Sequence, residues 1–170
     1  MNEQPLRRAV LTAALALALA GLGAFPAPLR AQTGPLQDLA TFPRTTLEIR
    51  GRSSTHQFDV WVADTEDRQA QGLMFVRDLP ANEGMLFVRC CSGIWMKNTY
   101  IPLDIVFVGP DGRIFKIAAD AQPFDETTIP AGQAVSAVVE LKGGEAAREG
   151  IKVGDRVEWH ASPAPTHAKN

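Results

Sequence analysis

Polar and apolar residues alternate along much of this chain, and the period predicts a fold built from short β-strands. Residues 46–50 and 58–62 place every second side chain on one apolar face, as expected of a strand with one buried side. Residues 103–108 are mostly apolar on both faces, which is typical of a strand inside a sheet. Further strands are predicted over residues 113–117, 134–141 and 155–159.

Turn and helix signals separate these strands. Residues 109–112 (Gly-Pro-Asp-Gly) predict a hairpin, because proline presets φ and glycine accepts positive φ. Short helices are predicted over residues 66–71 and 145–149, and a glycine follows each of them. These elements favour a mostly β fold, a compact β-sandwich or barrel of short antiparallel strands with two short helices.

The amino-terminal residues have the order of a secretory signal peptide. Arg7 and Arg8 precede an Ala- and Leu-rich run over residues 9–24, and small residues follow it. The run is shorter than the ~20 residues that span a bilayer. We therefore expect residues 1–31 to be a signal peptide and the protein to be exported, to the periplasm or the cell exterior. Membrane attachment is expected only where this segment stays uncleaved.

The remaining chain is predicted to hold one domain with two polar flanks. Residues 32–44 are a predicted linker, residues 45–160 a single domain and residues 161–170 a flexible tail. The 170 residues are 45% hydrophobic and 21% charged, which is ordinary for a globular domain. The length suits one core better than two.

The charge balance argues against nucleic acid as a partner. The whole chain carries a net charge of −2, and residues 1–31 contain three arginines and one glutamate, so the remaining residues carry −4. Lysine and arginine are scattered along the sequence rather than clustered. Nucleic acids and anionic membrane surfaces are therefore not expected partners.

Residues 95–104 mix large apolar side chains with amide and charged ones. Surface loops seldom carry large apolar side chains, and cores seldom carry unpaired amide or charged ones. This segment is therefore either a polar cluster with all its hydrogen bonds satisfied or one wall of a site. In the second case Lys97 and Asn98 hold an anionic or polyhydroxyl ligand, and Trp95 stacks on it. The predicted ligand-binding residues are Trp95, Lys97, Asn98, Thr99 and Asp104.

A second interpretation of the same region is enzymatic. Asp104 and Glu140 both lie on apolar strands, and they would suit general acid–base chemistry if they faced each other, as in a hydrolase. A structural hydrogen-bond network is the plainer alternative. The sequence holds no nucleophile elbow, His-rich metal motif or phosphate loop, so we favour a binding protein over an enzyme.

The sulfur-containing residues suggest a third interpretation. Met74, Met85 and Met96 recur every eleven residues, with Cys90 and Cys91 between the last two. Such ligands select monovalent copper, but methionine beside Leu and Phe also fills gaps in a core, and we expect no cofactor. The cysteines either form a strained vicinal disulfide or stay as free or intermolecularly paired thiols. On a regular strand they would point to opposite faces.

Several ordered blocks resemble domain-of-unknown-function family 192. The blocks are residues 72–77 (Gly-Leu-Met-Phe-Val-Arg), 84–87, 95–99 and 102–104, with shorter matches at residues 111–112, 139–141 and 150–155. The resemblance covers about residues 45–160 and implies a small, often exported, β-rich domain without an established activity. The family pattern does not require cysteines at positions 90 and 91.

Together these patterns predict an exported binding or accessory module of the cell envelope. Its expected partner is a small polar or polyhydroxyl ligand. The alternatives are a hydrolase-like enzyme that uses Asp104 and Glu140, and a copper-binding protein that uses the methionines and cysteines.

Overall fold

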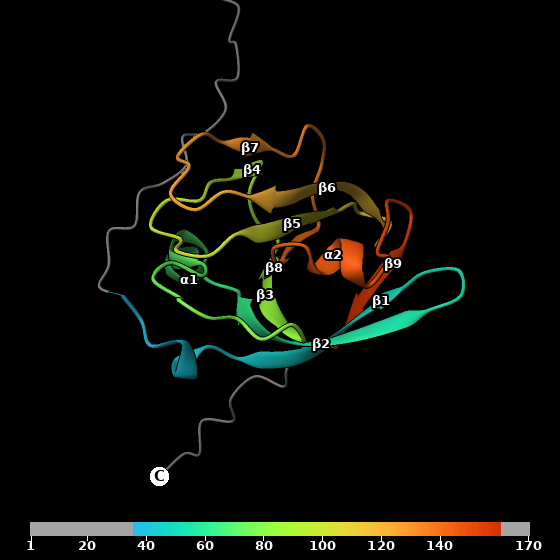
Figure 1. Ribbon diagram of the computed structural model, residues 1–170, viewed down its shortest axis with the longest axis horizontal. Helices are drawn as coiled ribbons and strands as arrows, with labels where there is room; N and C mark the ends of the chain where they lie inside the picture. Colours follow the sequence, from blue (N-terminus) through green and yellow to red (C-terminus); the bar gives the residue numbers. More distant parts are fainter. Residues whose placement is uncertain (1–35, 161–170) are drawn as a thin grey trace, which may run out of the picture.

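A computed structural model describes residues 36–160, which are predominantly β-structure (Figure 1). The elements are η1 (Leu39–Thr41), β1 (Arg44–Arg50), β2 (Thr55–Ala63), α1 (Glu66–Gln71), β3 (Glu83–Val88), β4 (Gly93–Ile94), β5 (Leu103–Val108), β6 (Ile114–Ala121), β7 (Ile129–Pro130), β8 (Ala137–Lys142), α2 (Glu145–Arg148) and β9 (Arg156–Trp159). The prediction of a mostly β fold with two short α-helices is confirmed.

Seven strands form one mixed sheet in the order β6-β5-β8-β3-β2-β1-β9. Neighbouring strands are antiparallel with one exception, the parallel pair β2 and β3. The expectation of antiparallel strands is therefore wrong for this pair. Parallel neighbours need a long crossover connection, and the segment that contains α1 supplies it.

The sheet curls without closing into a barrel (Figure 1). Its edge strands β6 and β9 approach each other at one end, where a single bridge joins Arg113 and Arg156. There the N–H of Ile114 donates to the carbonyl of Asp155 at 2.9 Å. The barrel form of the prediction is thus incorrect, because the edges meet at one end and do not pair along their length.

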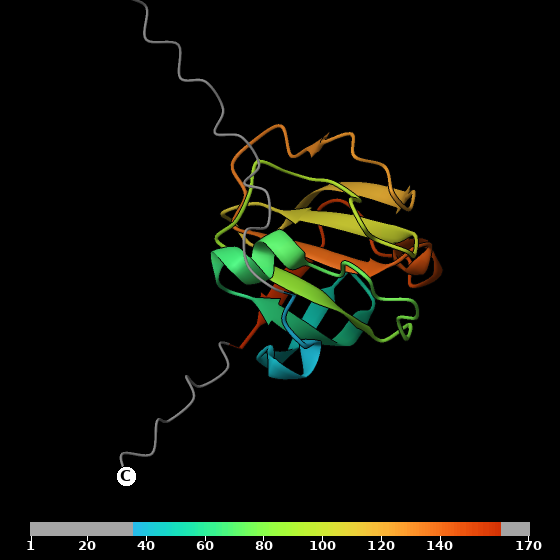
Figure 2. The ribbon, with the colours of Figure 1, turned by 90° about the vertical axis from the view of Figure 1, so that its left-hand side faces the viewer.

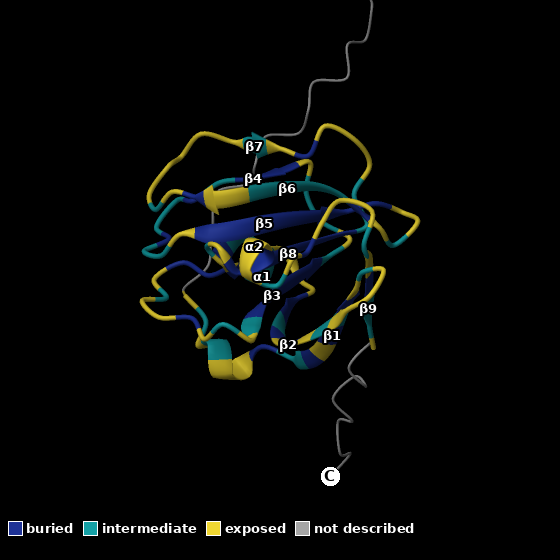
Figure 3. Ribbon diagram, turned by 45° about the vertical axis from the view of Figure 1, so that its right-hand side comes forward, coloured by how far each residue is buried: buried dark blue, intermediate teal, exposed yellow. Residues whose placement is uncertain are grey.

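The two faces of the sheet carry separate cores. The face that we call the α1 face packs under α1 and the small β4–β7 sheet, and Figure 2 shows α1 in front of the strands. The opposite face, here the α2 face, packs under Ala146 of α2. Because both faces are covered, β5 is buried along its whole length (Figure 3). The α1 face includes Met85, Phe87, Ile105, Phe107 and Val138, and the α2 face includes Leu86, Val106, Val108, Val139 and Leu141.

The six predicted strands are present with small shifts at their ends, and β3, β4 and β7 are additional. The described part of the predicted linker differs from a free spacer. It contains η1, its Phe42 is 4% exposed, and Gln37 exchanges backbone hydrogen bonds with the side chain of Gln71. Within the described range, no helix is long and apolar enough to cross a membrane. The predicted signal peptide and tail lie outside the described residues.

Candidate functional site

The side chain of Glu140 is buried on the α1 face, where it is 5% exposed. Its cross-strand partners are Met85 on β3 and Ile105 on β5. Strand β3 approaches β8 closely at Gly84, where an added Cβ would lie 2.4 Å from the backbone oxygen of Glu140. A residue with a side chain at this position would push the two strands apart, so Gly84 helps to set the position of Glu140.

The carboxyl group of Glu140 is incompletely paired. The backbone N–H of Leu73 donates a hydrogen bond to it, but Oε2 has no partner. Burial raises the pKa of Glu140 to about 8, against the smaller opposing effect of the Leu73 hydrogen bond. Glu140 is therefore mostly protonated at neutral pH, and it retains unused hydrogen-bonding capacity.

Glu140 lines a cavity of about 60 Å³, which we call the Glu140 pocket. A water molecule needs roughly 10–15 Å³ measured in this way, so the pocket accommodates a few waters or one small chemical group. Gly72 lies against the carboxyl group, since an added Cβ would stand 3.7 Å from Glu140 Oε2. The wall comprises Gln69, Ala70, Gln71, Gly72, Leu73, Met74, Phe87, Cys91, Gly93, Ile94, Trp95, Lys97, Thr99 and Glu140.

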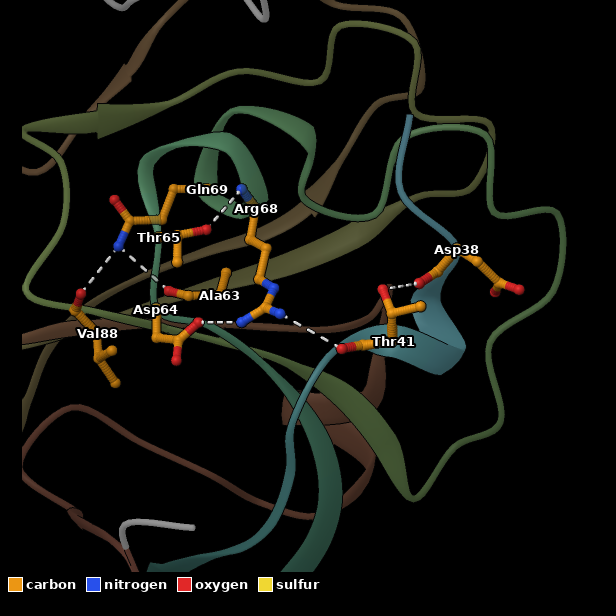
Figure 4. A network of polar contacts seen from close by, with 8 residues as sticks. All are labelled: Asp38, Thr41, Ala63, Asp64, Thr65, Arg68, Gln69 and Val88. Atoms are coloured by element: carbon orange, nitrogen blue, oxygen red, sulfur yellow. Dashed lines mark hydrogen bonds and ion pairs between the residues drawn. The ribbon is translucent and has the colours of Figure 1, made fainter. Parts of the chain in front are cut away.

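Helix α1 contributes Gln69, Ala70 and Gln71 to the pocket wall. A network of polar contacts holds this helix in place (Figure 4). Thr65 caps the helix by accepting from the N–H of Arg68 at 3.3 Å, and Arg68 pairs with Asp64 at 2.6 Å. Gln69 Nε2 donates to the carbonyl of Val88 at 2.9 Å, which ties the helix to the end of β3. These bonds fix the chain just before Gly72, where it turns towards Glu140.

Three of the predicted binding residues, Trp95, Lys97 and Thr99, line the pocket. Lys97 Nζ lies 5.0 Å from the centroid of the Trp95 ring, and no ion pair of Lys97 is found within residues 36–160. Thr99 is 5% exposed, and its hydroxyl donates to the carbonyl of Lys97 at 3.3 Å. The pocket therefore combines an aromatic ring, an ammonium group and a hydroxyl with the Glu140 carboxyl.

Asn98 does not line the pocket. Its φ of 54° lies in the left-handed region, and its carbonyl accepts the N–H of Phe75 at 2.9 Å. Its side-chain amide has a weak contact, 3.9 Å, with Met74 Sδ. In this conformation Asn98 turns the chain between Lys97 and Thr99, whereas the sequence analysis assigned it to ligand binding.

Asp104 is fully buried on the α2 face and has no place in the pocket wall. Its carboxylate accepts hydrogen bonds from the backbone N–H groups of Asp120 (2.8 Å), Gly144 (3.1 Å) and Ala146 (2.8 Å). Main-chain amides of β6 and the α2 region therefore satisfy this carboxylate, and no side-chain cation pairs with it in the described part of the chain. Asp104 thus holds α2 against the sheet.

Asp104 and Glu140 do not face each other, so the condition for the enzymatic interpretation is not met. In the β5–β8 register Asp104 lies opposite Leu141, and Ile105 lies opposite Glu140. Directly opposed residues share a face and successive residues alternate, so the two carboxyl groups project from opposite faces of the sheet. The sheet itself separates them, which excludes a shared reaction centre.

The sulfur-containing residues are also divided. Met74 lines the pocket, whereas Met85 and Met96 are 0% and 1% exposed within the core. No cluster of three or more His, Cys, Asp or Glu residues suited to a metal ion occurs in the described part of the chain. Cys90 and Cys91 are free and half-buried, and Cys91 lines the pocket.

The sequence analysis missed the wall formed by the end of α1 and the turn after it. Gln71, Gly72, Leu73 and Met74 enter the pocket because the chain turns sharply at Gly72, whose φ is 53°. The block over residues 72–77 was visible in the sequence, but its apolar composition suggested a core segment rather than a pocket wall. Its proximity to Glu140 depends on the parallel placement of β2 and β3.

The comparisons with known proteins confirm the family resemblance. The model of the family DUF192, described as "Uncharacterized ACR", matches residues 46–159. A crystal structure of a protein of unknown function from Novosphingobium aromaticivorans is 43% identical with a TM-score of 0.69, and the match covers 81% of this chain and 100% of that chain. A putative transcription regulator from Sinorhizobium meliloti is 35% identical with a TM-score of 0.67, over 69% of this chain and 95% of that chain. No curated protein gives a match to this chain.

Proposed function

Since the chain belongs to DUF192, an uncharacterised family, we propose a function from the geometry of its own pocket: an exported binding module of the cell envelope that holds a small polyhydroxyl ligand at the Glu140 carboxyl. The unpartnered Oε2 of Glu140, a residue that lines the pocket, carries this proposal. A buried polar atom without a partner costs about 1–3 kcal/mol, and a ligand hydroxyl would recover that cost.

The polar groups that remain available favour a neutral ligand with hydroxyl groups. A protonated Glu140 both donates and accepts hydrogen bonds, and Lys97 adds a donor at the same cavity. The side-chain N–H groups of Gln69 already bond to backbone carbonyls, which leaves less polar capacity on that wall. Trp95 and the apolar wall residues suit the C–H face of a polyol or sugar.

The size of the pocket limits what enters it. At about 60 Å³ the cavity takes a hydroxymethyl group or a short edge of a ring, and the rest of the ligand would lie at its mouth near Trp95 and Lys97. The small cavity therefore favours a binding mode in which the pocket recognises only a terminal group of the ligand. Export is the remaining part of the proposal, and it rests on the signal-peptide pattern of residues 1–31.

The test is an NMR titration of the purified protein at pH 6 with glycerol, glucose, N-acetylglucosamine and myo-inositol. We expect at least one of these compounds to shift the backbone amide signals of residues 72–74 and 95–99. Glu140→Gln should keep binding within a few-fold, because it preserves a neutral donor and acceptor, whereas Glu140→Leu should weaken binding by at least about tenfold.

The matched control is Glu126→Leu, because Glu126 is an exposed acid outside the pocket wall, and it should bind as the wild type does. Binding by the wild type should weaken as the pH rises through about 8, when Glu140 loses its proton. If no polyol moves the pocket signals, or if Glu140→Leu binds as tightly as the wild type, the proposal is refuted.

A further inference from the structure

Cys90 and Cys91 lie in a short segment between β3 and β4 rather than on a regular strand. The segment is held at both ends: Arg89 donates its N–H to the carbonyl of Ser136 at 3.1 Å, and the carbonyl of Ser92 accepts from Ala131 at 2.8 Å. Arg89 has a φ of 51°, which turns the chain immediately before the cysteines. The alternation of a strand therefore does not separate their side chains.

The two thiols lie within hydrogen-bonding range of each other, and both are free and half-buried. They differ in what else they contact. Cys91 lines the Glu140 pocket, whereas Cys90 Sγ points to the carbonyl of Phe87 at 4.0 Å and is absent from the pocket wall. The hydrogen bond with Cys91, burial, and the nearby Cys91 and Glu140 charges all raise the pKa of Cys90, so Cys90 stays a thiol at neutral pH.

We propose that Cys91 and Cys90 form a thiol–disulfide exchange pair, in which Cys91 attacks a small organic disulfide from the pocket and Cys90 resolves the product. This goes beyond the proposed ligand binding and does not depend on it. Glu140 lines the same pocket as Cys91, and its ionised fraction, which grows as the pH approaches its pKa of about 8, is the proton acceptor for Cys91. Glu140 thus accepts and returns protons, while the sulfur atoms of Cys91 and Cys90 form and break the bonds.

In the first step the Cys91 thiol gives its proton to ionised Glu140, and its sulfur attacks one sulfur of the disulfide R–S–S–R. A bond forms between Cys91 and that sulfur, the R–S–S–R bond breaks, and the leaving thiolate takes the proton from Glu140 as R–SH. In the second step Cys90 passes its proton to Glu140 and attacks Cys91 Sγ. A Cys90–Cys91 disulfide forms, and the second R–S group leaves with the proton as R–SH.

Two electrons pass from the cysteine pair to the substrate, so the substrate disulfide is reduced to two thiols. A disulfide between adjacent residues is strained and therefore easily reduced. The reaction consequently runs in either direction according to the local ratio of thiol to disulfide. Neither an additional oxidant nor a metal takes part.

The test treats the fully reduced protein at pH 7.5 with 2-hydroxyethyl disulfide and follows the intact mass. We expect the wild type to become two hydrogens lighter without a lasting adduct. Cys90→Ser should accumulate a mixed disulfide that peptide mapping places on Cys91. Cys91→Ser should react at least about tenfold more slowly, because its remaining thiol is half-buried and outside the pocket wall.

Glu140→Gln should slow adduct formation in the Cys90→Ser background by at least about tenfold, while Glu126→Gln should not change it. Circular dichroism verifies that each variant is folded. An equal rate for Cys91→Ser and Cys90→Ser, two lasting adducts on the wild type, or a disulfide-linked dimer as the main product would overturn the proposal. The assay contains no polyol, so a negative result would refute the exchange reaction without bearing on ligand binding. A negative polyol titration would likewise leave the exchange reaction untouched.

Discussion

Asp104 and Glu140 are both buried acids on neighbouring strands of the same sheet, but their carboxyl groups differ in how many hydrogen-bond partners they have. Asp104 receives three backbone N–H groups, which saturate its carboxylate on the α2 face. Glu140 receives one backbone N–H on the α1 face, its Oε2 has no partner, and the residue lines a cavity. Burial alone therefore does not indicate a site, whereas burial with an unused polar atom beside a cavity does.

The origin of the partners explains this difference. The donors to Asp104 come from the main chain of β6 and of the α2 region, so they are fixed by the topology of the fold. The pocket around Glu140 is built from α1, β3, β4, β8 and the segments that connect them, and their side chains leave space between them. A carboxyl group of the first kind holds the fold together, and one of the second kind is available to a ligand or a proton.

The largest effect that would test this comparison is the loss of the Asp104 carboxylate. Asp104→Ala removes a fully buried carboxylate and leaves three N–H groups without their acceptor, that of Ala146 in a buried position, and we expect it to lower the free energy of unfolding by about 3–5 kcal/mol in urea denaturation. The exposed acid Asp67, in the first turn of α1, provides the control, and Asp67→Ala should change stability by no more than about 0.5 kcal/mol. A loss below about 1 kcal/mol for Asp104→Ala would contradict a structural role for this carboxylate.

The next effect concerns the pH dependence of stability. The folded protein binds the Glu140 proton more tightly than the unfolded chain does, because the folded pKa is about 8 against roughly 4.3 when unfolded. The contribution of Glu140 to the free energy of unfolding is therefore highest below about pH 4 and falls as the pH rises to about 8. The slope approaches roughly 1.4 kcal/mol per pH unit between these values.

Glu140→Gln should remove this slope and make the protein more stable than the wild type at pH 8.5, by a few kcal/mol, since a neutral amide needs no ionisation in the unfolded chain. Urea denaturation at pH 5, 7 and 8.5 measures the effect, with Glu126→Gln as the exposed control. Parallel pH profiles for the wild type and Glu140→Gln would show that Glu140 has an ordinary pKa, and the contrast with Asp104 would then disappear.

The smallest expected effect is that of replacing Lys97, which tests whether this lysine influences the Glu140 carboxyl group. Lys97 contacts the ring of Trp95, and the pKa of Glu140 is set by burial and by the Leu73 backbone rather than by this lysine. Lys97→Met should leave the Glu140 pKa unchanged within about half a unit and should alter the free energy of unfolding by less than about 1 kcal/mol. Carbon-13 NMR of the Glu140 carboxyl group measures the former. A pKa raised by one unit or more would instead identify Lys97 as its counter-ion.

Much of the β-structure could be predicted from the sequence because it depends on local alternation. Residues 103–108 coincide with β5, and residues 66–71 with α1. Strand β3 escaped prediction because Glu83–Val88 has four consecutive buried residues rather than an alternating pattern. The parallel placement of β3 beside β2 is a long-range property that no local pattern records.

The candidate site was partly predictable, because some of its residues stand out in the local sequence pattern. Trp95, Lys97 and Thr99 were identified because polar residues interrupt an apolar segment, and all three line the pocket. The pairing of Asp104 with Glu140 failed because residue type does not reveal register. A shift of one position on β5 moves a side chain to the other face of the sheet, and Ile105 rather than Asp104 lies opposite Glu140.

The position of β9 has a consequence for how this chain folds. The last strand pairs with the first one, β1, so β1 acquires its second neighbour only after nearly all of the domain has been synthesised. Contacts of such sequence separation slow folding, because the long intervening chain must be ordered before they form. A chain that ends before Arg156 would also leave β1 as an open edge, and an open edge is a template for pairing with another chain. The carboxy-terminal strand thus covers the outer side of β1 in the finished domain as well as completing the sheet.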